Sequence, residues 1–223
     1  IDQLEFHLSM VYQQYLDTNY NYDNITIICR DKKLQPWDPF CINEPKSEIL
    51  AEEAKEVHDQ DGNLVGKFEL SAHCIPNRFN FSSDKALKNA RITNNMQGFY
   101  IYRQGRLIHR GGWLGIRALE PHFTLSRVKL SFDYKLDDAF KVDLKKSRIL
   151  MDEGLIDYIK NEFLPAPVRE SETRYRKGKK SAVQEMSKNA HHESNVLISN
   201  KEEDVSQSKK KVIDESSGET EIT

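Results

Sequence analysis

The sequence has few cysteines and no long hydrophobic run. Its three cysteines, Cys29, Cys41 and Cys74, lack any CxxC spacing. The pattern therefore indicates neither a disulfide framework nor a zinc ribbon, and it favours a reducing, cytoplasmic compartment. No apolar stretch approaches the roughly 18 residues that a membrane-spanning helix needs. We expect no membrane partner.

Common catalytic motifs are also missing. The histidines are scattered and show no HExxH spacing, so no metal ligands are predicted. The glycines of GGWLG at 111–115 are not followed by Lys-Ser/Thr and lack the third glycine of a dinucleotide loop. No nucleophile elbow is present. The sequence gives little support to a self-contained, one-domain enzyme.

Charge is plentiful but unevenly distributed. The net charge is only −2, yet no acidic residue lies between Asp84 and Glu120. Basic side chains there, together with a basic segment at 169–180, can form a phosphate-binding face. The alternative is a solvated sheet edge, where positive charge discourages strand pairing. The candidate nucleic-acid contacts are Arg91, Arg103, Arg106, Arg110, Arg117, Arg174 and Arg176.

Hydrophobic periodicity predicts an α+β fold with a mixed, mostly antiparallel sheet and helices on one face. A helix is expected over 4–16. The Asp-Gly-Asn turn at 61–63 favours a hairpin over a helix in the segment around it, and Ser82-Ser83-Asp84 is expected to cap a short helix. FYIYR and RLIHR form a second hairpin, strands follow at 128–133 and 140–144, and a helix capped by Asp152 ends at Pro165 and Pro167.

Composition divides the chain into three parts. Residues 1–20 are expected to form a connector helix, residues 21–167 the folded domain, and residues 168–223 a charged, largely disordered linker. The last part has almost no aromatic residues, so it cannot bury enough apolar surface to offset its chain entropy.

Lys145-Lys146-Ser147 ends the alternating segment Phe140, Val142, Leu144. Adjacent residues leaving a strand point to opposite sides, so one ammonium can face a pocket and sense a phosphate, although paired lysines are more often solvated. A weaker pattern joins Asp133 to Asp143-Leu144-Lys145. Two carboxylates and a lysine on neighbouring strands suit a metal-dependent nuclease, and equally a surface pair.

A longer resemblance covers roughly residues 4–152. HLSMVYQQYL, NITIICRDKKLQPWDPF, QGFYIYRQGRLIHRGGWLGI and LSRVKLSFDYKLDDAFKVDLKKSRI follow one another in an order that resembles the second, transducer domain of GHKL ATPases. This superfamily includes gyrase B subunits, MutL mismatch-repair proteins, heat-shock chaperones and MORC proteins. The sequence looks most similar to bacterial MORC- and MutL-like proteins, several of which act in restriction-modification and phage defence.

The resemblance implies a role as well as a transducer-type βαβ fold. In that superfamily an N-terminal domain binds ATP and Mg²⁺, and the transducer supplies a lysine that reaches the γ-phosphate. Lys146 resembles that lysine by its place before Ser147, with Lys145 as the alternative. The resemblance further implies an ATP-binding domain as partner, a homodimer, and DNA as a possible ligand.

One departure from the family limits this expectation. The acidic base with its Asn, the DxGxG turn and the Gly-rich ATP lid are not in the sequence. We therefore expect no cofactor and no ATPase activity in this chain alone. Together with a first residue, Ile1, that falls within a helical pattern, this predicts a fragment of a longer ATPase. The alternative function is a nucleic-acid-binding module, with or without nuclease activity.

Overall fold

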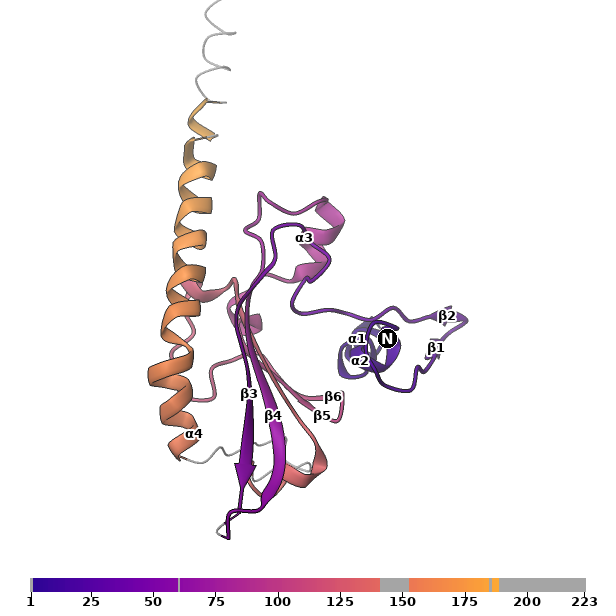
Figure 1. Ribbon diagram of the computed structural model, residues 1–223. Coiled ribbons are helices and arrows are strands. Elements are labelled where there is room, and N and C mark those ends of the chain that lie inside the picture. The colour runs from indigo at the N-terminus through magenta and orange to yellow at the C-terminus, as the bar shows by residue number, and fades with distance from the viewer. Residues whose placement is uncertain (1, 60, 141–152, 185, 189–223) are drawn as a thin grey trace, which may run out of the picture. The chain divides into compact units, whose positions relative to one another are not determined.

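A computed structural model describes residues 2–59, 61–140, 153–184 and 186–188. The chain separates into a unit of Ile1–Gly178 and a unit of Lys179–Thr223. The first contains a five-stranded sheet of order β3-β4-β7-β5-β6, antiparallel except for the β5–β7 pair (Figure 1). The strands are β3 (Glu48–His58), β4 (Leu64–Cys74), β5 (Gly98–Arg103), β6 (Arg106–Arg110) and β7 (Ser126–Phe132). The expected α+β class with a mixed, mostly antiparallel sheet is confirmed.

The β3–β4 hairpin forms although β3 is rich in helix-forming residues. Asp59 Oδ1 accepts hydrogen bonds from the backbone N–H of Asp61 and of Asn63, at 3.0 and 2.8 Å. Gly62 has φ +84°, which a turn of this kind requires. Pairing with β4 therefore overrides local helix propensity, and the predicted hairpin is confirmed.

The β5–β6 hairpin is closed by a two-residue turn. Gln104 and Gly105 have φ of 47° and 77°, and positive φ at both central positions matches the twist of the strands. A Cβ on Gly105 would lie 2.7 Å from the ring of Tyr22, so glycine is also required by packing. The second predicted hairpin is confirmed.

One face of the sheet forms the main hydrophobic core. Side chains at alternate positions of the central strands, such as Leu70, Ile101 and Leu130, pack against residues of the C-terminal helices, including Ile159 and Val168. These helices are α4 (Glu153–Tyr158), the π-helix η4 (Ile159–Phe163) and helical residues 165–178. In Figure 1 this helical stretch runs along the β3–β4 side of the sheet.

The predicted helix ends before Pro165, as expected, but a second helix follows that the sequence did not predict. The π-helix ends at Phe163, Leu164 bends, and a new helix begins at residue 165. The two prolines occupy its first turn, where backbone N–H groups have no intrahelical acceptor, so proline costs nothing there. The chain stays folded past residue 167, because Val168 is buried and Ser171 is fully buried. The boundary between the units follows Gly178.

The opposite face carries a second core. Tyr100 and Tyr102 of β5 pack there with Met10 and Val11 of α1 (Asp2–Val11) and with Phe40. The short helix α2 (Gln13–Leu16) follows after a turn at Tyr12, so the predicted N-terminal helix forms as two short helices. Because α1 and the C-terminal helices pack on opposite faces, the expected placement of all helices on one face is wrong. The remaining elements are β1 (Ile28–Cys29), β2 (Lys32–Lys33), α3 (Asp84–Ala90), η1 (Asn94–Met96), η2 (Pro121–Phe123) and η3 (Tyr134–Leu136). The N-cap of α3 is Ser83, as the sequence predicts.

Candidate functional site

The two candidate switch lysines, Lys145 and Lys146, lie outside the described residues. The chain before them is anchored by Phe140, which is 2% exposed. Its ring stacks on Phe132 with centroids 4.3 Å apart and meets Phe68 edge-on at 5.7 Å. The chain after them resumes at α4, whose helix continues into the main core. Phe140 is therefore fixed to the sheet, whereas the side chains of α4 that pack against the core are only partly buried.

The short helix η3 follows β7 and is held in place by contacts with two other strands. Arg103 of β5 donates two hydrogen bonds to Asp137, from Nε to Oδ1 and from Nη2 to Oδ2, each 2.6 Å long. Leu136 is fully buried and packs against Gly66 of β4. A bidentate guanidinium–carboxylate pair fixes orientation as well as distance. Contacts with β4 and β5 thus hold helix η3, which directly follows β7 in the chain.

Asp133, a candidate ligand in the nuclease hypothesis, caps η3. Its Oδ1 accepts the backbone N–H of Lys135 at 2.9 Å. The other two members of that pattern, Asp143 and Lys145, lie outside the described residues. Within the part of the chain that the structure describes, no group of three His, Cys, Asp or Glu side chains is arranged to hold a metal ion.

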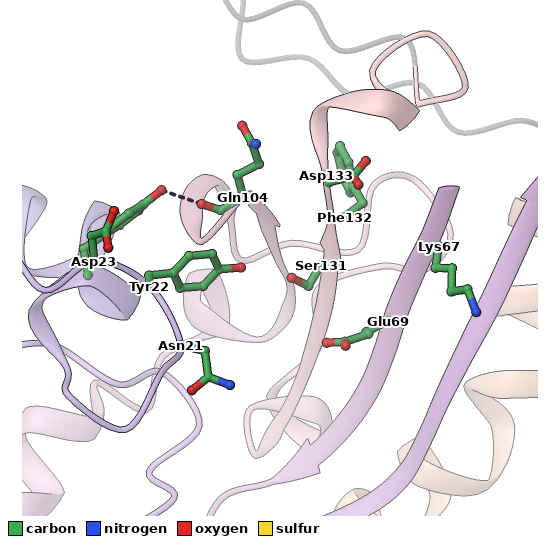
Figure 2. Close-up of a pocket in the computed structure, with 10 residues that line it drawn as sticks. Asn21, Tyr22, Asp23, Lys67, Glu69, Gln104, Ser131, Phe132 and Asp133 are labelled. Atoms are coloured by element: carbon green, nitrogen blue, oxygen red, sulfur yellow. Dashed lines mark hydrogen bonds between the residues drawn. The ribbon is translucent and has the colours of Figure 1, made fainter. Parts of the chain in front are cut away.

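A cavity of about 570 Å³ opens beside the end of β7 (Figure 2). Tyr15 donates its hydroxyl hydrogen bond to the carbonyl of Gln104 at 2.6 Å, and the rings of Tyr15 and Tyr22 lie 5.2 Å apart. Burial raises the pKa of Tyr22, so its hydroxyl stays protonated. The lining residues are Tyr15, Asn21, Tyr22, Asp23, Lys67, Glu69, Gln104, Ser131, Phe132 and Asp133.

The charge of this cavity is negative. Three carboxylates line it, from Asp23, Glu69 and Asp133, while the ammonium of Lys67 pairs with Glu56 at 2.7 Å. The lining comes from segments far apart in the sequence, so no motif signals it. Phe132, which lines the cavity, also carries the stacked ring of Phe140, so the cavity and Phe140 share one support.

Three of the candidate nucleic-acid arginines are paired with carboxylates of this chain. Arg103 binds Asp137, as described above. Arg174 binds Glu170 at 2.9 Å and also contacts Glu48. Arg176 binds Glu172 at 2.6 Å. Internal partners neutralise these charges, which reduces their value for binding phosphates.

Three others gather around the first helix. Arg91 lies over the ring of Phe6 at 3.6 Å, Arg106 lies 5.8 Å from the ring of Tyr12, and Arg110 Nη1 contacts Met10 Sδ at 3.9 Å. All three are exposed. Arg117 stacks instead on Phe123, at 4.3 Å, beside another part of the fold. The predicted patch is thus divided among several places.

A buried arginine that the sequence did not single out lies beneath α3. Arg127 is fully buried and donates to the hydroxyl of Tyr100 at 2.8 Å and to the carbonyls of Ala90 and Arg91 at 3.4 and 3.5 Å. These carbonyls end α3, where the helix dipole favours positive charge. Its contacts make Arg127 a structural residue.

A Ser–His pair at 2.8 Å joins Ser71 Oγ and His73 Nε2 on β4. Both residues are buried, and the ring of Phe40 covers His73 with centroids 4.4 Å apart. Burial lowers the pKa of His73 to about 4, which makes it a weak base at neutral pH. Burial also raises the pKa of the Cys41 thiol to about 12. Neither group suits nucleophilic catalysis.

Comparison with known proteins gives no relative. No family model, curated protein or solved structure matches the chain. The described residues include no helix with the length and hydrophobicity to cross a membrane.

Proposed function

We propose that this chain is a transducer-type domain of a GHKL-type ATPase. In this proposal Lys146, with Lys145 as the alternative, senses the γ-phosphate of ATP held by a separate ATP-binding domain of the same protein, which also carries Mg²⁺. The sheet relays the nucleotide state to dimerisation and to DNA handling or defence in the cytoplasm. The order of motifs over residues 4–152 and the α+β fold support this assignment.

One observation carries the proposal: α1 and Phe140, the last described residue before the candidate lysines, pack on opposite faces of the same sheet. α1 packs on Tyr100 and Tyr102 of β5, and Tyr102 donates to Gln13 Oε1 at 3.2 Å. Phe140 stacks on Phe132 of β7. β5 and β7 are directly paired, with Tyr102 opposite Ser131. Closely packed interiors transmit displacements, so a shift on one face reaches the other.

Sensing the γ-phosphate requires a lysine whose distance from ATP differs between the open and closed arrangements of the two domains. An ammonium on a flexible stem is a mobile point charge that suits a terminal phosphate. If it contacts ATP only in a closed arrangement of the two domains, ATP binds the closed state more tightly and shifts the population toward it. Hydrolysis then removes the contact between the lysine and the γ-phosphate, and the closed arrangement of the two domains is no longer favoured.

The test uses the full-length protein that contains both domains. ATP turnover is measured for Lys146→Ala and Lys145→Ala, with Lys135→Ala as a control that removes the same charge from an exposed position in η3. We expect turnover to fall severalfold for one of the first two variants and to remain unchanged for the control. The assignment fails if neither variant differs from Lys135→Ala.

A second candidate function is DNA binding. It is favoured by the exposed Arg91, Arg106 and Arg110 around α1, none of which forms an ion pair with a carboxylate among the described residues. Filter binding of duplex DNA at several salt concentrations tests it. Binding through this surface is supported if affinity falls steeply with salt, and falls less steeply in a variant in which Arg91, Arg106 and Arg110 are all replaced by glutamine. Equal binding by the variant excludes it.

A further inference from the structure

A second cavity, of about 400 Å³, lies between the segment 116–123 and the π-helix η4. Two basic residues, Arg117 and Lys160, line it together with Asn161. Its apolar lining residues include Phe123 and Leu164, and Glu120 is its one acidic lining residue. The cavity shares none of its lining residues with the cavity beside β7.

Arg117 is held in place before any ligand arrives. Its guanidinium carbon lies 4.3 Å from the centre of the Phe123 ring, and that ring is fixed edge-on by Trp113 at 6.4 Å. Trp113 Nε1 in turn donates to the buried amide of Gln97 at 2.9 Å. Across the described residues Arg117 forms no ion pair with a carboxylate. A stacked guanidinium keeps its N–H fork free at the edge of the ring, and little side-chain entropy remains to be lost on binding.

The π-helix presents the other polar groups. Leu164 N donates to the carbonyl of Ile159 at 2.9 Å, a bond spanning five residues, and Ile159 and Phe163 are anchored in the core. The wider turn places the adjacent residues Lys160 and Asn161, as well as Leu164, along the same cavity. Short π-helical turns of this kind occur frequently at functional sites.

Glu120 is the acidic residue among the lining residues of this second cavity, opposite in charge to Arg117 and Lys160. Its backbone is held by Gln97, whose Nε2 donates to the Glu120 carbonyl at 2.9 Å, and its side chain is exposed. Two cations therefore face one carboxylate, and the cavity is positive overall. A planar fork, a point charge and an amide donor around one space form the donor set that proteins use for phosphate oxygens.

We propose that this cavity is a binding site for a phosphate group, with Arg117 and Lys160 as its charged contacts and Asn161 as an amide donor. The phosphate belongs either to a small organic phosphate or to a nucleic-acid backbone. The site is separate from the nucleotide switch proposed above and does not depend on Lys145 or Lys146.

The experiment titrates the purified chain with pyrophosphate by calorimetry at low ionic strength. Variants Arg117→Gln and Lys160→Gln each remove one charge-assisted contact, so affinity should fall about tenfold in each. Matched controls Arg78→Gln and Lys135→Gln remove the same charges from exposed positions outside the cavity and should leave affinity unchanged. Far-ultraviolet circular dichroism checks that each variant is folded.

Competition identifies the source of the phosphate. If a single-stranded oligonucleotide displaces pyrophosphate, and its own affinity falls in Arg117→Gln, the site binds a nucleic-acid backbone. Displacement by a nucleoside bisphosphate but not by the oligonucleotide supports a small organic phosphate. The proposal is overturned if pyrophosphate does not bind at millimolar concentration, or if the control variants weaken binding as much as the cavity variants.

Discussion

At the scale of single residues, Phe140 fixes the start of the connection that carries the two candidate lysines. Its ring is 2% exposed and lies between Phe132 and Phe68. Truncation in Phe140→Ala leaves a cavity in the main core, so the free energy of unfolding should fall by about 3 to 5 kcal/mol. Urea denaturation followed by circular dichroism measures this change.

The control for this prediction is Tyr134→Ala, on the neighbouring helix η3. Tyr134 is 55% exposed, so its truncation should change the free energy of unfolding by no more than about 0.5 kcal/mol. Equal effects of the two substitutions would show that the stacking of Phe140 does not stabilise the fold. The role of Phe140 in fixing the chain before the candidate lysines would then lose its basis.

His73 makes stability depend on pH. Burial lowers its pKa to about 4, whereas an unfolded histidine titrates near 6.5. The unfolded chain therefore binds a proton that the folded chain rejects, and stability is lost as pH falls from 6.5 toward 4. Between pH 7.5 and pH 5 the free energy of unfolding should decrease by about 2 kcal/mol from this group.

A comparison with His73→Gln isolates this contribution. The variant retains the other titrating groups, including the nearby Lys129 and the buried Asp38, whose pKa is raised by desolvation. Urea midpoints measured from pH 7.5 to pH 5 should fall more steeply in the original chain than in the variant. Parallel curves would contradict the buried, neutral state of His73.

At the scale of elements, Trp37 joins three parts of the fold. Its backbone N–H donates to Ser9 of α1 at 3.1 Å, its indole Nε1 donates to Asn89 at the end of α3 at 2.8 Å, and its ring lies 6.2 Å from that of Tyr100 on β5. Trp37→Phe removes the indole hydrogen bond and some ring volume. We expect a loss of about 2 kcal/mol in the free energy of unfolding.

Hydrogen exchange distinguishes this role from general packing. The amide of Leu87 in α3, which donates to the carbonyl of the N-cap residue Ser83, should exchange faster in Trp37→Phe, because α3 loses a hydrogen bond to the rest of the fold. Amides of the distant β3–β4 hairpin serve as the internal control. Unchanged exchange in α3 would mean that Trp37 does not secure that helix.

Some elements could be predicted from the sequence because their signals are local. The Asp-Gly-Asn turn specified the β3–β4 hairpin, and Ser83 specified the start of α3. The effect of Pro165 could not be read in the same way, since proline ends one helix or begins the next according to where the preceding turn stops. Here the first helix ends at Phe163 and Pro165 begins the next one.

The candidate sites were harder to predict because their contacts are remote in sequence. Arg103 meets Asp137 across 34 residues, and Arg174 meets Glu48 across 126 residues, so neither pairing could be predicted from the charges of neighbouring residues. Both cavities likewise join separate segments. Periodicity identifies strands and faces, but it does not identify which side chains meet across them.

At the scale of the whole molecule, composition and packing place the domain boundary differently. Composition suggested a linker from residue 168, yet Val168 is 2% exposed and Ser171 is 0% exposed. The helix through Gly178 also carries Arg174, which contacts Glu48 on the edge strand β3. A helix rich in charged residues can still belong to the core when its few apolar positions share one face.

Two truncations test where the folded unit ends. A chain that stops after Gly178 keeps the whole first unit, so its free energy of unfolding should remain within about 1 kcal/mol of the original. A chain that stops after Pro167 lacks the buried Val168 and exposes the apolar surface beneath it, which should cost about 2 kcal/mol or more. Urea denaturation of both chains decides the matter: equal stability would place the boundary at 167, whereas a loss confined to the shorter chain places it after Gly178.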